Sequence, residues 1–231
     1  VTEALPELQS RGLPGTFFIA TAFLNGGRMF NDTVIETVRR LESPVDLEAF
    51  GLASARLDDM DSRRNLVGKI LKEVKYLEPG ERDEWVTRFA ALAPGSLPDD
   101  LMMTDDQVRQ LHSAGMEVGG HTHNHPILAR VGPDEARTEI DQGRDRLQTI
   151  TGAPVVSFAY PNGIPGVDYL DMHPLLLQEM GWRQAVTTAW GSVRADSDWL
   201  QLPRISPWDR TPLRLVARLV RSYLQAPGRT V

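Results

Sequence analysis

The sequence concentrates histidine in one short stretch. Three of its five histidines, His121, His123 and His125, fall within the segment Gly-Gly-His-Thr-His-Asn-His-Pro at residues 119–126. Two imidazoles four residues apart, where a strand end turns into a loop, can converge on one divalent cation. The chain has no cysteine, so nitrogen and oxygen atoms would hold such a cation, which suits Zn²⁺ and also Co²⁺, Ni²⁺ or Fe²⁺. The alternative is a polar loop that is merely rich in histidine, and the position at a strand terminus favours the metal site.

Two further segments place polar groups beside strand ends. In residues 158–163, Phe-Ala-Tyr-Pro-Asn-Gly, a strand ends in a turn whose backbone N–H groups can face a pocket. Arg204 lies within an otherwise apolar strand, and a buried arginine is costly without a carboxylate partner. Arg204 therefore either orients an active-site acid or forms a structural ion pair. Along a strand-like stretch, the side chain of His123 would point away from those of its two neighbours. We therefore expect His123 to support the metal ligands from beside them or to be exposed, and not to bind the metal.

Composition and missing motifs exclude several classes of function. The net charge is −6, which argues against nucleic acid or anionic lipid as the main partner. The longest apolar run, residues 17–20, is too short to cross a bilayer. Phosphate loops, nucleophile elbows and dinucleotide fingerprints are missing from the sequence, so phosphoryl transfer, serine hydrolysis and dinucleotide chemistry lack support. A chain without cysteine is compatible with a compartment on either side of a membrane, cytoplasmic or in the cell envelope.

The pattern of apolar residues predicts a single α/β domain over residues 1–231 with a parallel sheet. Strands and helices alternate, and each strand is spaced for a crossover helix. The expected strands cover residues 15–21, 116–122, 155–160, 184–190 and 200–205. The expected helices cover residues 2–12, 104–115, 133–152, 168–181 and 211–224.

Residues 42–100 differ from the rest of the chain. They are rich in charge, and their apolar residues recur at helical spacing, which predicts a helical insertion with a solvated outer face. Before this insertion, Asn31 or Asp32 can cap a helix that runs to Arg40.

Together these segments resemble the polysaccharide deacetylase family, the NodB-homology carbohydrate esterases, over residues 1–205 apart from the insertion. His-Thr-His-Asn-His-Pro at residues 121–126 matches the family's His-Ser/Thr-x-x-His-Pro metal motif. Residues 158–163 are similar to the third motif of the branch that acts on poly-N-acetylglucosamine-type polymers. Arg204 resembles the arginine that approaches the catalytic acid in that branch. The resemblance implies a distorted (β/α) barrel of the NodB type, with fewer strands than a TIM barrel.

The resemblance also implies an activity, the hydrolysis of an N-acetyl group from a hexosamine unit of a glycan. A divalent metal, zinc before cobalt, nickel or iron, would polarise the acetyl carbonyl and activate a water. His121 and His125 would hold this metal. The backbone N–H of Asn162 would face the developing oxyanion, while Tyr160 and Pro161 would shape the acetate pocket.

Three other residues receive weaker expectations. His123, or else water, would protonate the leaving amine, because the late histidine that often does so in the family is not found after His173. Asp32 could contact sugar hydroxyls, although a helix cap explains it equally well. Trp190 could stack on a sugar ring, although a role in the core is the commoner one for tryptophan.

The sequence departs from the family pattern in its first motif. That motif is an Asp-Asp pair on the strand before the helix that residues 1–11 resemble, and the chain does not contain it. We therefore expect the chain to begin partway into the domain and to lack the first strand. The leading interpretation is a deacetylase of a bacterial surface or exported glycan. The alternatives are a catalytically silent glycan-binding relative and a deacetylase or deformylase of a small or lipid-linked sugar.

Overall fold

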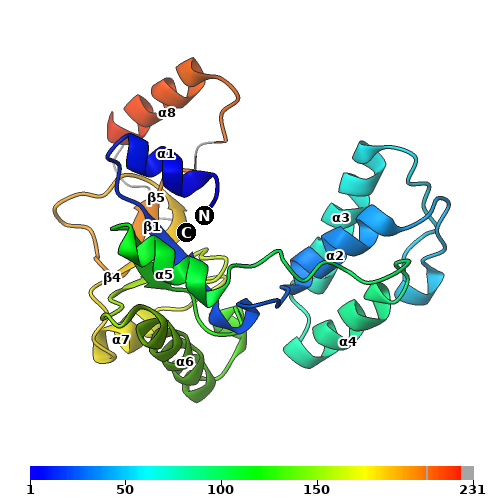
Figure 1. Cartoon of the computed structure of the whole chain (residues 1–231), viewed down its shortest axis with the longest axis horizontal. Helices are drawn as coiled ribbons and strands as arrows, with labels where there is room; N and C mark the ends of the chain where they lie inside the picture. The colour runs from blue at the N-terminus through cyan, green and yellow to red at the C-terminus, as the bar shows by residue number, and fades with distance from the viewer. Residues whose placement is uncertain (207, 225–231) are drawn as a thin grey trace. The chain divides into compact units, whose positions relative to one another are not determined.

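The structure, a computed structural model, describes residues 1–206 and 208–224, and Figure 1 shows the elements along the chain. The chain divides into two compact units. The first comprises Val1–Ala22 and Asp105–Val231, and the second comprises Phe23–Thr104. The second unit contains residues 42–100, for which the sequence predicts helices.

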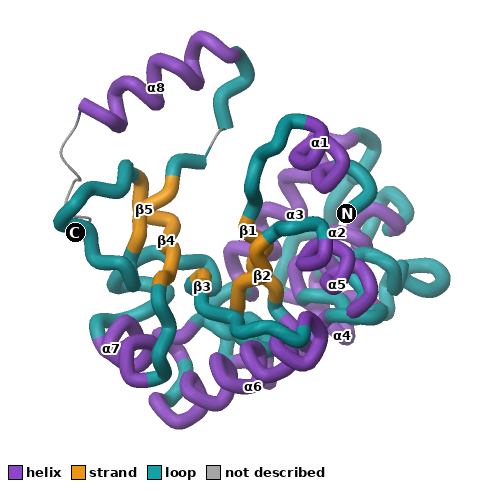
Figure 2. Tube along the Cα trace, turned by 60° about the vertical axis from the view of Figure 1, so that its left-hand side comes forward, coloured by secondary structure: helices purple, strands orange, loops and turns teal. Residues whose placement is uncertain are grey.

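The first unit is built on a parallel sheet. Its strands are β1 (Thr16–Ile19), β2 (Glu117–Gly120), β3 (Ser157–Ala159), β4 (Gln184–Trp190) and β5 (Leu202–Arg204). They lie side by side in the order β1-β2-β3-β4-β5, and each neighbouring pair is parallel (Figure 2). Their carboxyl ends therefore meet at one edge, which is where ligands bind in parallel α/β sheets. The predicted α/β class and each of the predicted strands are confirmed.

Helices precede, connect and follow these strands, except that β4 and β5 have no helix between them. These helices are α1 (Ala4–Ser10), α5 (Asp105–Ser113), α6 (Pro133–Thr151), α7 (Met172–Glu179) and α8 (Pro212–Leu224), with the 3-10 helices η1 (Thr21–Phe23) and η3 (Leu128–Arg130). Helix α6 begins at Pro133, whose fixed φ suits the first helical position, and ends before the left-handed Gly152. Ile140, Leu147 and Ile150 form part of its buried face. Both α5 and α6 pack against β2 and against each other, so α6 lies next to the strand that leads into the histidine loop.

The second unit is helical and has its own core. It contains α2 (Phe30–Arg40), η2 (Glu48–Phe50), α3 (Met60–Val74) and α4 (Pro79–Ala90), with α2 packed against α3 and α4. Helix α3 begins at a capping box formed by Asp59 and Ser62. The core residues include Val34, Val38, Leu47, Ile70, Val74 and Phe89.

The predicted cap of the helix that ends at Arg40 is wrong. Helix α2 begins at Phe30, and its N-cap is Met29, whose side chain accepts no capping hydrogen bond. Asp32 instead lies in the first turn, where the partial positive charge of the helix N-terminus stabilises a carboxylate.

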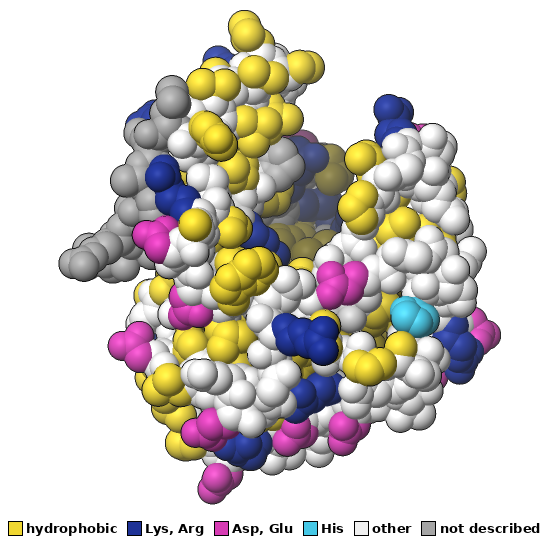
Figure 3. Space-filling view, turned by 90° about the vertical axis from the view of Figure 1, so that its left-hand side faces the viewer, with side chains coloured by type: hydrophobic (Ala, Val, Ile, Leu, Met, Phe, Trp, Pro, Cys, Tyr) yellow, Lys and Arg dark blue, Asp and Glu magenta, His cyan; other side chains and the backbone are white. Residues whose placement is uncertain are grey.

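Helix α8 turns apolar side chains toward solvent. Figure 3 shows hydrophobic side chains gathered over the upper part of the view, where α8 lies. Its exposed large hydrophobic residues are Leu213, Val216, Leu219, Val220 and Tyr223. The Trp190 indole N–H donates to the Ser222 hydroxyl at 2.9 Å and so connects α8 to β4. Within the described residues, no helix is both long enough and apolar enough to span a membrane.

Candidate metal centre

His121 follows directly on β2, at the carboxyl edge of the sheet, and close packing requires the two glycines that precede it. A Cβ on Gly119 would lie 2.5 Å from the Phe18 ring, and a Cβ on Gly120 would lie 2.7 Å from the Trp182 ring. A side chain at either position would displace these aromatic rings. The glycine pair thus lets the strand lie directly against them, which fixes where the histidine loop begins.

The two predicted ligands, His121 and His125, meet in this loop. Their Nε2 atoms are 3.0 Å apart, and their ring planes are inclined at 72°. Two nitrogens that both present lone pairs repel each other at this distance unless a proton or a cation is shared between them. Nitrogens bound to one tetrahedral zinc ion at about 2.0–2.1 Å would be about 3.3 Å apart. The pair therefore fits two positions of a metal site, and no group of three or more metal-ligating side chains occurs among the described residues.

The tautomer of His121 is set by the neighbouring strand. Its Nδ1 lies 2.7 Å from the Ala159 carbonyl oxygen, which can only accept, so Nδ1 carries the proton. Nε2 is then left with a lone pair toward His125. Burial lowers the pKa of His121 to about 4, with a further lowering from the charge of Arg204. A neutral imidazole with its lone pair directed at a partner is the form that binds a metal.

The lowered pKa of His121 predicts acid-sensitive stability of the metal-free protein. Between pH 6.5 and about 4 the unfolded chain binds a proton that the folded chain does not, so stability falls as the pH is lowered through this range. The contribution of His121 approaches about 3 kcal/mol at the acid end. Urea unfolding with chelator present, at pH 7 and pH 4.5, measures this effect. In His121→Gln the loss of stability should be smaller by that amount, and an unchanged pH dependence in this variant would contradict the assignment.

His123 lies between His121 and His125 in the sequence, and its ring contacts Thr21. Its Nδ1 is 2.8 Å from the Thr21 hydroxyl oxygen, and its backbone carbonyl accepts a hydrogen bond from the Ala22 N–H at 3.0 Å. The Thr21 contact orients the ring. A histidine held at Nδ1 retains Nε2 for proton transfer.

The turn after β3 also directs backbone groups toward the sheet edge. Asn162 has a φ of 58°, the left-handed conformation, and its carbonyl accepts from the Thr188 hydroxyl at 3.0 Å. Gly163 donates to the Pro161 carbonyl at 2.6 Å and accepts from the Thr188 N–H at 2.8 Å. Within the described residues, no group accepts a hydrogen bond from the Asn162 N–H. The turn is therefore held rigidly while this donor is left available.

The structure buries two residues expected to shape an acetate pocket. The Tyr160 ring is 1% exposed, stacks on Tyr169 with centroids 3.9 Å apart, and donates its hydroxyl to the Leu200 carbonyl. Burial raises the pKa of Tyr160, so its phenol stays protonated. Pro161 is also buried. The side chains of Tyr160 and Pro161 therefore pack in the core beneath the turn that follows β3.

Arg204 lies at the end of β5, in register with Trp190 of β4. Its Nε donates to the Thr187 carbonyl at 2.6 Å, and burial lowers its pKa. No carboxylate of the described residues forms an ion pair with it. The structure thus places the charge of Arg204 near His121 without an acidic partner, and the orientation of a catalytic acid by Arg204 remains a prediction.

The remaining two predicted contacts, Trp190 and Asp32, belong to different units. Trp190 is 38% exposed, its N–H is bonded to Ser222, and the Arg218 guanidinium lies 5.1 Å from the centre of its ring. Asp32 belongs to the second unit, where burial raises its pKa. Sugar binding by either residue remains a prediction.

Sequence reasoning missed the groups that hold the histidines in place. These are the Ala159 carbonyl, the Thr21 hydroxyl and the carboxylate of Glu139, which accepts hydrogen bonds from the histidine loop. One signal for Glu139 was present in the sequence. It lies on the same face of α6 as Ala136, Ile140 and Gly143, and an acidic residue on a buried helical face needs a polar partner.

Comparisons with known proteins show which family profile and which folds the chain matches. The sequence profile of a family described as polysaccharide deacetylase matches residues 1–184. The fold is similar to IcaB from Ammonifex degensii, with 15% identity, a TM-score of 0.53, and coverage of 95% of this chain and 66% of IcaB. It is also similar to the BpsB deacetylase domain from Bordetella bronchiseptica, with 15% identity, a TM-score of 0.51, and coverage of 88% and 64%. The chain thus spans slightly less than two thirds of either structure. No curated protein sequence matches it.

Proposed function

Because the chain belongs to the polysaccharide deacetylase family, we propose that it is part of a metal-dependent hydrolase that removes N-acetyl groups from N-acetylhexosamine units of a glycan. Water and the amide would give acetate and a free amine. The observation that carries this proposal is the 3.0 Å approach of the His121 and His125 Nε2 atoms at the carboxyl edge of the sheet. A metal bound there would supply a Lewis acid and lower the pKa of a bound water.

The chain's own residues supply the other parts of the reaction. The Asn162 N–H is an available donor in a rigid turn, and such donors stabilise the negative charge that develops on the acetyl oxygen. His123, oriented by Thr21, would pass a proton to the leaving nitrogen. Burial keeps the His121 imidazole unprotonated by lowering its pKa, and the positive charge of Arg204 adds to this lowering. Zinc, or else cobalt, nickel or iron, suits the nitrogen ligands.

One observation favours a second candidate, a glycan-binding relative without turnover. Among the described residues, no carboxylate joins the histidine pair to act as a third ligand or as a general base. Such a relative would retain the sheet edge and bind the sugar without releasing acetate.

Acetate release separates the two candidates. The protein as its gene encodes it, loaded with Zn²⁺ or Co²⁺, is expected to release acetate from β-1,6- or β-1,4-linked N-acetylglucosamine oligomers, and chelator should stop the reaction. Comparing the two linkages, and both with N-acetylglucosamine monomer, tests the substrate class. Binding of oligomers without acetate under any metal would support the silent relative and overturn the hydrolase.

A further inference from the structure

The loop that carries the histidines contains two residues in an unfavourable backbone conformation. Thr122 has a φ of 62° and His125 a φ of 56°, the left-handed conformation that side-chain-bearing residues rarely adopt. For a β-branched residue such as Thr122 this conformation is especially unfavourable. Such strain persists only where the surrounding structure holds the backbone in place. The convergence of His121 and His125 therefore depends on whatever holds the loop.

Helix α6 supports the loop through Glu139. This carboxylate is 8% exposed and accepts hydrogen bonds from the backbone N–H of His123 at 3.1 Å and of Asn124 at 2.7 Å. Its second oxygen accepts from the Asn124 side-chain amide at 2.7 Å. No cation of the described residues forms an ion pair with Glu139. Its buried charge is therefore satisfied by the loop itself, through charge-assisted hydrogen bonds.

Gly143, one turn further along α6, brings the loop within reach. A Cβ at this position would lie 2.7 Å from the Thr122 carbonyl oxygen, which is too close for any side chain. The loop is also held by the Ala22 N–H and the Thr21 hydroxyl, which both contact His123. Glu139 and Gly143 share one face of α6 because they are four residues apart. That face is thus shaped to receive residues 122–124.

We infer that Glu139 is a positioning residue, which holds the His123–Asn124 backbone so that the imidazoles of His121 and His125 meet at the metal position. The inference rests on the proposed function for its catalytic consequence. Its structural content is independent of catalysis, because it concerns only the hydrogen bonds between helix α6 and the histidine loop.

The test compares three variants of helix α6 in the whole protein. Glu139→Ala removes the acceptors. Glu139→Gln keeps one oxygen for the two backbone N–H groups, and the Asn124 amide can flip to accept from the new NH₂. Glu135→Ala removes an exposed carboxylate one turn earlier on the same helix and is the matched control. The readouts are Zn²⁺ affinity, by competition with a chromophoric chelator, and hydrogen exchange of the His123 and Asn124 amides without metal.

We expect Glu139→Ala to weaken Zn²⁺ binding about 10- to 100-fold and to abolish protection of the two amides. Glu139→Gln should restore most of both, and Glu135→Ala should match the unmodified protein. Should Glu139→Ala not fold, Asn124→Ala removes a single one of the hydrogen bonds, and Zn²⁺ affinity should fall severalfold.

Two results would overturn the inference: unchanged affinity and protection in Glu139→Ala, or a Gln variant as impaired as the Ala variant. If the unmodified protein binds no Zn²⁺, the proposed function fails. The exchange measurement then still decides the role of Glu139 in the loop.

Discussion

Replacing His121 by alanine is expected to abolish both metal binding and acetate release. The variant removes one of the two nitrogens that meet at 3.0 Å, and the remaining His125 cannot hold a divalent ion alone at ordinary concentrations. Without the ion, the Lewis acid and the activated water are both lost, so turnover should fall at least about 10³-fold. Metal content by elemental analysis and acetate release from N-acetylglucosamine oligomers measure the two effects. His125→Ala should behave in the same way.

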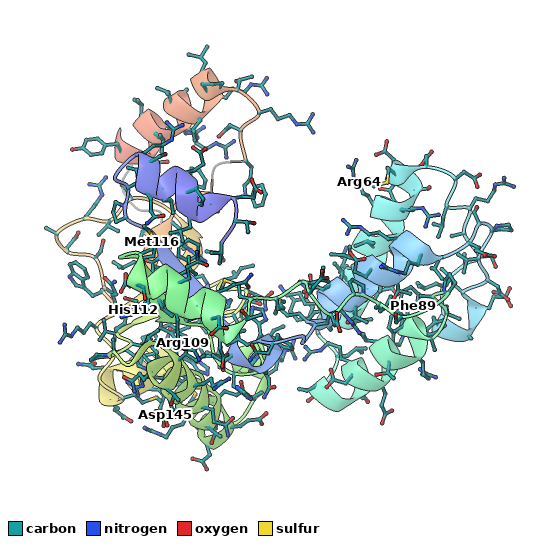
Figure 4. All side chains as sticks on the ribbon, viewed as in Figure 1. Arg64, Phe89, Arg109, His112, Met116 and Asp145 are labelled. Atoms are coloured by element: carbon teal, nitrogen blue, oxygen red, sulfur yellow. The ribbon has the colours of Figure 1, made fainter. Side chains whose placement is uncertain are left out.

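His112→Ala is the matched control for this experiment. His112 is also an imidazole of the first unit, but it lies on α5, where Figure 4 labels it, and not in the histidine loop. Its replacement should leave metal content and turnover unchanged. Full activity in His121→Ala would refute the assignment of the metal site, while equal losses in both variants would point to a general loss of structure.

The second large effect concerns the stability of the helical unit. Phe89 is fully buried on α4, where Figure 4 labels it, and its ring contacts Phe50 edge-on at 5.4 Å and stacks with Trp85 at 5.1 Å. Phe89→Ala removes this aromatic packing and leaves a cavity, so the free energy of unfolding of the second unit should fall by about 3–5 kcal/mol. Urea unfolding followed by tryptophan fluorescence measures the loss.

Leu92→Ala is the control, because Leu92 is 39% exposed in the same unit and should change stability by less than about 1 kcal/mol. Zn²⁺ affinity in Phe89→Ala should equal that of the unmodified protein, since the ligands belong to the first unit. A Phe89→Ala variant as stable as the parent would contradict the core assignment. A matching loss of Zn²⁺ affinity would show that the two units unfold together.

The secondary structure of this protein could be predicted because it is encoded locally. Strand β4, residues 184–190, reads as a β-branched and apolar run between glycines, and α6 has a proline at its start and a glycine at its end. The helix that contains Asp32 shows where this reasoning fails. Ser, Thr, Asn and Asp favour capping positions, but here the N-cap is Met29, three residues before Asp32. A cap depends on where the backbone turns, which neighbouring packing decides.

In the candidate site, too, some features could be predicted from short segments of sequence and others could not. The spacing of His121 and His125 and the Pro-Asn-Gly turn are properties of short segments, so the sequence alone pointed to a metal ligand pair and a backbone donor. The supporting groups come from distant segments: Ala159 from β3, Thr21 from η1 and Glu139 from α6. Their contacts with the loop span up to 102 residues of sequence. No local pattern specifies which distant group will be adjacent.

By itself, the sequence determined the α/β class, the strand order along the chain and the loop that carries the paired imidazoles, because periodicity and spacing act within a few residues. Only the tertiary structure decided that the two Nε2 atoms face each other, that Tyr160 is buried in the core, and that Arg204 has a carbonyl rather than a carboxylate as its partner. Protonation, burial and hydrogen bonding depend on the three-dimensional surroundings, which form only when separate segments pack together.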